Sequence, residues 1–166
     1  GSITGATSAA FLSGVESSLI NAGTINGGQH GVYLFNGSTM ENLETGNIFG
    51  TDFGVYGANA VAEVVNNGDI TSAGGTGIGL ENGGKVANNS TGNIIGADDG
   101  IAIANASGEV KNAGAITAFS GDGIRLEAGG KVNNLSGGVI DGANNGVLIA
   151  TNLGEIINEG TIDGAD

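Results

Sequence analysis

Cysteine and proline are both absent from this chain of 166 residues. Without cysteine the protein can hold neither a disulfide framework nor a cysteine-ligated metal ion, so a small stapled domain and a zinc ribbon are excluded. Aromatic residues make up only 4% of the chain, which means that a core has to be built from small and β-branched side chains. No apolar run approaches the length of a membrane span or of a signal-peptide core.

Basic residues are also scarce. Four Lys and Arg stand against 17 Asp and Glu, which gives a formal net charge of −13. This charge opposes binding to nucleic acid and to anionic membrane surfaces, so we predict neither a nucleic-acid partner nor membrane insertion of this segment. What the chain does contain is 35 glycines and 39% hydrophobic residues, too many hydrophobic residues for a typical disordered chain.

The glycines fall at a fixed period. A glycine followed by Val or Ile recurs every 23 residues, at Gly31, Gly54, Gly77, Gly100, Gly123 and Gly146. Isoleucines recur every 22 to 24 residues, at Ile25, Ile48, Ile70, Ile94, Ile116, Ile140 and Ile162. A repeat of this length is the signature of a stacked-coil architecture. We predict a single β-helical segment over 1–166, with clear repeats over 15–166, and interpret Gly1 and Ser2 as a cloning scar.

Within each coil the hydrophobic pattern has a period of two, as in "GIRLEAG", "GIGLENG" and "GIAIANA". This is the alternation of a strand, and Gly, Asn, Asp and Ser fill the corners between three short strands per coil. We predict an all-β fold, a right-handed parallel β-helix of about seven coils of 22–24 residues. A leucine-rich repeat has a similar period, but its leucine framework is missing, and the six-residue period of a left-handed β-helix is absent.

The same alternation predicts which side chains point inward. Besides the isoleucine column, we expect these to be Val32, Leu34, Val55, Val64, Ile78, Leu80, Val86, Ile101, Ile103, Val110, Ile124, Leu126, Val132, Val147, Ile149 and Ile156. One coil cannot cover its own apolar face, so the stability is expected to belong to the stack.

Two polar columns follow the repeat. The first holds one asparagine per coil, and we predict a ladder of stacked side-chain amides with a structural role at Asn21, Asn42, Asn66, Asn88, Asn112, Asn134 and Asn158. The second alternates in charge from coil to coil, at Glu63, Lys85, Glu109, Lys131 and Glu155. We interpret it as a ladder that fixes the register on a solvated face, and a charged binding strip is the alternative.

The chain offers little for catalysis, with one histidine, His30, and one arginine, Arg125. Acidic residues gather just before the repeating glycine, at Asp52, Asp98, Asp99 and Asp122. A weak calcium site or a pair of glycosidase carboxylates is the functional interpretation. Since no long loop is inserted, we favour solvated turn acids and an exposed His30, and we predict no catalytic residue, no metal site and no cofactor.

Five of the seven Phe and Tyr residues lie within two coils, and we predict a candidate binding patch made of Tyr33, Phe35, Phe49, Phe53 and Tyr56. Tyr33 and Tyr56 share one outward column, so their rings are expected about one strand spacing apart. Exposed aromatic side chains on an acidic surface are typical of a contact site. The alternative is that the patch packs against a preceding domain.

The segments "AEVVNNGDITS", "GEVKNAGAITA" and "GEIINEGTIDG" resemble the passenger domains of bacterial autotransporters and related adhesins of type V secretion. The resemblance covers residues 15–166 and rests on the style of the repeat. It implies a piece of a large β-helix that is secreted or displayed on the surface of a Gram-negative bacterium.

Two classes of function stay open at this point. The first is a non-catalytic structural and adhesive module that binds a host-surface protein or glycan, or another copy of itself, with end-to-end association through its terminal coils. The second is a polysaccharide-cleaving enzyme of the lyase or tailspike type, which would need clustered acidic and basic residues under inserted loops.

Overall fold

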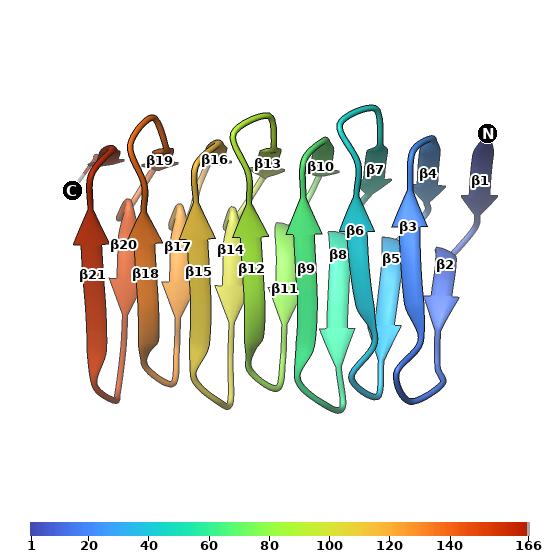
Figure 1. Ribbon diagram of the computed structural model, residues 1–166, viewed down its shortest axis with the longest axis horizontal. Coiled ribbons are helices and arrows are strands. Elements are labelled where there is room, and N and C mark those ends of the chain that lie inside the picture. Colours follow the sequence, from blue (N-terminus) through green and yellow to red (C-terminus); the bar gives the residue numbers. More distant parts are fainter. Residues whose placement is uncertain (166) are drawn as a thin grey trace.

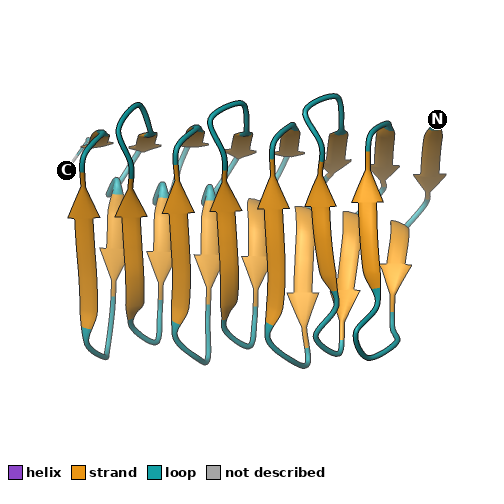
Figure 2. Cartoon of the chain, in the orientation of Figure 1, coloured by secondary structure: helices purple, strands orange, loops and turns teal. Residues whose placement is uncertain are grey.

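The computed structural model describes residues 1–165 and contains strands and turns only (Figures 1 and 2). The chain winds through three strands per coil for about seven turns and forms a β-solenoid, with its two termini at opposite ends of the stack. The predicted all-β, stacked-coil fold is therefore confirmed, and the right-handed turn of the coil stays a prediction. These residues form no helix, and hence none that is long and apolar enough to cross a membrane.

Three parallel sheets make up the three faces of the solenoid, and each coil contributes one strand to each sheet. The first sheet consists of β1 (Ser2–Gly5), β4 (Thr24–Gly27), β7 (Asn47–Gly50), β10 (Asp69–Ser72), β13 (Asn93–Gly96), β16 (Ala115–Ala118), β19 (Val139–Gly142) and β22 (Thr161–Gly164). The second sheet consists of β2 (Ser8–Leu12), β5 (His30–Phe35), β8 (Phe53–Ala58), β11 (Thr76–Leu80), β14 (Ile101–Ile103), β17 (Ile124–Leu126) and β20 (Val147–Ile149). The third sheet consists of β3 (Ser18–Asn21), β6 (Thr39–Asn42), β9 (Ala62–Asn66), β12 (Gly84–Asn88), β15 (Gly108–Asn112), β18 (Gly130–Asn134) and β21 (Gly154–Asn158).

Each side chain stacks on its equivalent in the next coil, because the chain returns to the same place once per repeat. In the first sheet, Ile48 lies in register with Ile25 on one side and with Ile70 on the other. The isoleucine column continues through the remaining strands of that sheet. The repeat therefore sets the register of the sheet as well as its fold.

The core is one continuous column of aliphatic side chains inside the three sheets. The inward positions expected from the alternation are buried throughout the middle of the stack. The last coils differ, since Val147, Ile149 and Ile162 are half-buried and Ile156 is 48% exposed. Ile156 lies in register with the buried Val132, but no further coil of this chain covers it. Ile156 therefore occupies the inward column as expected, on the strand at the end of its sheet.

Candidate functional site

The asparagine column forms a ladder of hydrogen bonds that runs the length of the solenoid. Each Nδ2 donates to Oδ1 of the asparagine in the next coil at 2.8 or 2.9 Å, from Asn21 through to Asn158. The same Nδ2 atoms also donate to carbonyls of the adjoining turn, as Asn66 does to Gly68. Because the amides are buried along most of the column and bonded to one another, they serve the stack and not a ligand.

The charged column lies on the outer face of the third sheet. Lys85 lies in register with Glu63 and Glu109, and Lys131 lies in register with Glu109 and Glu155. The ion pairs are Lys85 to Glu109 at 3.7 Å and Lys131 to Glu155 at 2.8 Å. The side chains of these two pairs are 42 to 64% exposed. Lys85, Glu109 and Lys131 line an open groove that carries both signs of charge.

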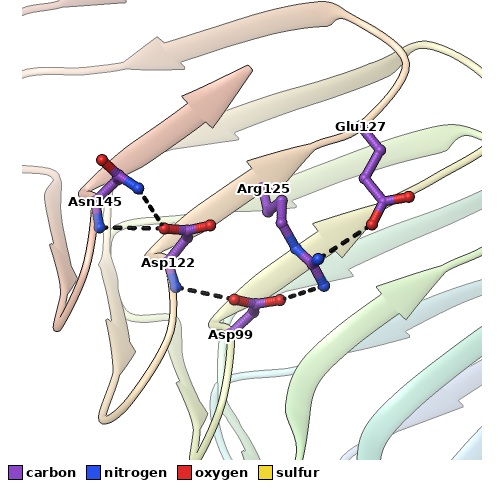
Figure 3. A network of polar contacts seen from close by, with 5 residues as sticks. All are labelled: Asp99, Asp122, Arg125, Glu127 and Asn145. Carbon is purple, nitrogen blue, oxygen red and sulfur yellow. Dashed lines mark hydrogen bonds and ion pairs between the residues drawn. The ribbon is translucent and has the colours of Figure 1, made fainter. Parts of the chain in front are cut away.

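Two of the four acidic residues at the corner before the second sheet are buried, which corrects the expectation of solvated turn acids for Asp99 and Asp122. Asp99 is 3% exposed and Asp122 is 6% exposed, whereas Asp52 and Asp98 do lie in solvent. The backbone N–H of Asp122 donates to Oδ1 of Asp99 at 2.9 Å (Figure 3). Asn145 donates to Oδ1 of Asp122 through its backbone N–H and its Nδ2. Each buried carboxylate therefore accepts hydrogen bonds from the corner of the following coil.

Arg125 completes this network from the outer face of β17 (Figure 3). Its Nη2 lies 2.7 Å from Oδ2 of Asp99, and its Nη1 lies 3.1 Å from Oε1 of Glu127. Burial raises the pKa of Asp99 above its ordinary value, and the hydrogen bond from Asp122 and the charge of Arg125 oppose that rise. Among residues 1–165, no group of three or more His, Asp or Glu side chains could hold a metal ion.

Aromatic side chains gather on the outer face of the second sheet. The rings of Tyr33 and Tyr56 lie 5.1 Å apart, one strand spacing as expected, and Phe11 lies 4.9 Å from Tyr33 on the preceding strand. We call the set formed by Phe11, His30, Tyr33, Phe35, Phe53 and Tyr56 the aromatic cluster. Its ring stack ends at Phe53, whose ring occupies the place where a side chain at Gly79 would lie.

The membership of the cluster differs from the predicted patch in three ways. Phe49 lies on β7 of the first sheet and takes part in none of the ring pairs found in residues 1–165. Phe11 belongs to it, and its place 22 residues before Tyr33 was the available signal. His30 is half-buried between the rings of Tyr33, Phe53 and Tyr56, which corrects the expectation of an exposed corner residue.

The cluster alters the ionisation of two of its members. Desolvation lowers the pKa of His30, and the nearby charge of Asp52 opposes this effect. Desolvation also raises the pKa of Tyr56, and its hydroxyl donates a hydrogen bond to the carboxylate of Glu81, which raises the pKa further. The cluster is therefore uncharged near neutral pH, with acidic groups at its edge.

A second asparagine column borders the cluster at the corner between the second and third sheets. We call Asn36, Asn59, Asn82 and Asn105 the outer amide ladder. Asn36, Asn59 and Asn105 have φ angles of 58°, 73° and 60°, the left-handed conformation that asparagine tolerates better than most residues. Nδ2 of Asn59 donates to Oδ1 of Asn36, and the backbone N–H of Asn59 donates to Oδ1 of Asn82. Unlike the inner ladder, these amides reach solvent.

No known family, curated protein or solved structure matches the chain. Two groups of side chains stand out chemically. One is the partly buried network of Asp99, Asp122 and Arg125, and the other is the aromatic cluster. Both oxygens of Asp99 and Oδ1 of Asp122 already contact backbone N–H or guanidinium groups, which suits a structural role. The cluster offers uncharged aromatic surface with amides beside it, which suits binding.

Proposed function

We propose that this chain is a non-catalytic segment of a bacterial surface or secreted protein, a β-helical stalk whose aromatic cluster attaches to a host-surface protein or glycan or to another copy. The observation that carries the proposal is the cluster itself. All its members lie on one outer face of an otherwise regular stack, and Phe11 is 57% exposed. Exposed aromatic groups of this size usually mark contact sites, because rigid rings bury much area at low entropy cost.

Placement outside the cell is supported by the resemblance to autotransporter passengers and by the composition. A chain without cysteine forms no disulfide before it is translocated, and an acidic chain stays soluble. The solenoid suits a stalk, since each coil repeats the same contacts and the stack lengthens by adding coils. The source is proposed to be a Gram-negative bacterium.

The test uses the double variant Tyr33→Ala with Tyr56→Ala, displayed on beads and applied to epithelial cells and extracellular matrix. We expect attachment to be lost while circular dichroism still reports a strand-rich fold. Phe119→Ala is the matched control, because Phe119 is 69% exposed and lies outside the cluster. Unchanged attachment by the double variant would contradict the proposal and leave the segment as a spacer.

The second candidate function is cleavage of an acidic polysaccharide. One observation favours it, since Asp99, Asp122 and Arg125 combine buried carboxylates with a cation on one side of the stack. Against it, both oxygens of Asp99 and Oδ1 of Asp122 are engaged in the network described above. Release of new reducing ends from polygalacturonate, abolished by Asp99→Asn, would replace the stalk proposal with this one.

A further inference from the structure

We propose that the aromatic cluster binds a neutral glycan, and that the outer amide ladder hydrogen-bonds the hydroxyl groups of that glycan. This inference rests on the proposed attachment function and names the chemistry of its ligand. A pyranose ring presents a C–H face that packs against aromatic rings and hydroxyl groups around its rim that pair with amides. The chain places both kinds of partner side by side on one face.

The rings leave two kinds of aromatic surface open. Phe11 packs against Tyr33 with the ring centroids 4.9 Å apart, and it is 57% exposed. Phe35 stands nearly perpendicular to Tyr33, with an angle of 81° between the rings and centroids 5.9 Å apart. The surface therefore combines an open ring face with a second ring set at an angle to it. Stacking on such surfaces needs no charge on the ligand.

The outer amide ladder begins directly beside these rings, because Asn36 follows Phe35 in the chain. In the described part of the chain, Oδ1 of Asn59 and Nδ2 of Asn82 take part in no hydrogen bond with the protein. One acceptor and one donor, on residues of adjacent coils, are thus free for a ligand.

The charges around the cluster favour an uncharged ligand. Asp52 and Glu81 border it, and the second of these accepts a hydrogen bond from Tyr56. Three of the four basic residues, Lys85, Lys111 and Lys131, lie on the third sheet, and the fourth, Arg125, is paired with Asp99. An anionic glycan would meet acidic groups without a compensating cation, so the neutral class is the one that fits.

The size of the cluster argues against a second copy as the occupant. The cluster spans the three strands β2, β5 and β8, about 14 Å along the stack, and the length of β5, about 20 Å. That area is on the order of 300 Å², well below the roughly 800 Å² per partner of a stable protein interface. A strip of this area is large enough to bind a narrow chain such as an oligosaccharide. It is too small to form a stable interface with a folded protein.

The experiment titrates the intact chain with neutral oligosaccharides of glucose, mannose and galactose in α and β linkages, and with oligogalacturonate as the anionic probe. Calorimetry reports affinity, and the side-chain amide signals in the NMR spectrum report contact with the ladder. We expect at least one neutral probe to bind and to shift the signals of Asn59 and Asn82. The anionic probe should leave these signals unchanged.

Matched variants separate binding from folding. Phe11→Ala should lower the affinity for the neutral probe on the order of tenfold. Phe119→Ala should leave that affinity unchanged. Asn59→Gly keeps the left-handed conformation, since Asn59 has a φ of 73°, but removes the free Oδ1, so it should weaken binding of the neutral probe without straining the turn. Equal binding by Phe11→Ala and Phe119→Ala, or binding of no neutral probe, would overturn the inference.

The same set of measurements distinguishes this inference from the proposed function. If no neutral probe binds while the double tyrosine variant still loses attachment to cells, the attachment function stands and its ligand is a protein. If the double variant attaches normally, the proposed function itself is wrong.

Discussion

Arg125 reaches back by one coil and neutralises Asp99, with Nη2 and Oδ2 2.7 Å apart. The register partner of Arg125 in that coil is Ala102, whose small side chain leaves room for the long one to fold over it. The side chain of Asp99 is 5% exposed and that of Arg125 is 36% exposed, so water reaches the cation far more than the anion. The pair therefore ties β14 to β17 from outside the hydrophobic core.

Removing the cation should destabilise the stack more than removing both charges. Arg125→Met leaves a buried carboxylate without its counter-ion, and we expect a loss of about 1–3 kcal/mol in the free energy of unfolding. Asp99→Asn combined with Arg125→Met should recover part of this loss, because the introduced amide retains an oxygen that accepts from the backbone of Asp122. Urea denaturation measures both, and equal midpoints for the single and double variants would contradict the role of the pair.

Asp99 should also make stability depend on pH in a defined direction. Its pKa is raised above the ordinary value of 3.8, so the folded state holds this proton more tightly than the unfolded state does. The contribution of Asp99 is therefore greatest below pH 3.8 and is lost as the pH rises through the raised pKa. Asp99→Asn should remove this contribution, so that the stability of the variant relative to the native chain grows from acid to neutral pH. A constant difference between the two across that range would show that Asp99 does not titrate as described.

The inner asparagine ladder should be sensitive at single positions. Asn88→Ala removes the donor to Oδ1 of Asn112 and the acceptor of Nδ2 of Asn66, and we expect a loss of about 1–3 kcal/mol for each buried group left unpaired. Asn89→Ala is the control, because the adjacent amide bonds in solvent to Asn67. Thermal unfolding should separate the two variants, and similar melting temperatures would count against the ladder.

The sequence alone predicted most of the fold, because in a solenoid a residue touches its own equivalent one period away. The isoleucines that recur in the sequence at Ile25, Ile48 and Ile70 are therefore also neighbours in the sheet. The tyrosine column follows by the same logic, and its rings lie at the expected spacing. The repeat period therefore identifies long-range contacts that cannot be read from the sequence of a fold without repeats.

The corners were harder to predict. Strand alternation does not report whether a turn carboxylate faces solvent or the N–H of the next coil, so Asp99 and Asp122 were assigned to the surface although they are buried. The signal was present as a column, since Asp99, Asp122 and Asn145 all precede the repeating glycine. Phe11 is missed for a different reason, because the first coil lacks that glycine and the residue is found only by counting back 22 positions from Tyr33.

The alternating charges of the third sheet should penalise a charge reversal. Lys85→Glu would place three carboxylates in register, at Glu63, the new residue and Glu109. Like charges directly opposite one another repel, so the loss should exceed that of one exposed ion pair and reach about 1 kcal/mol or more. The triple variant with Glu63→Lys and Glu109→Lys restores alternation around position 85, although the lysine at 109 then faces Lys131. We expect the triple variant to recover part of the lost stability in urea denaturation.

The difference in stability between the single and triple variants should shrink in high salt, because these side chains are exposed. Identical midpoints at low salt would show that the column does not act as a ladder.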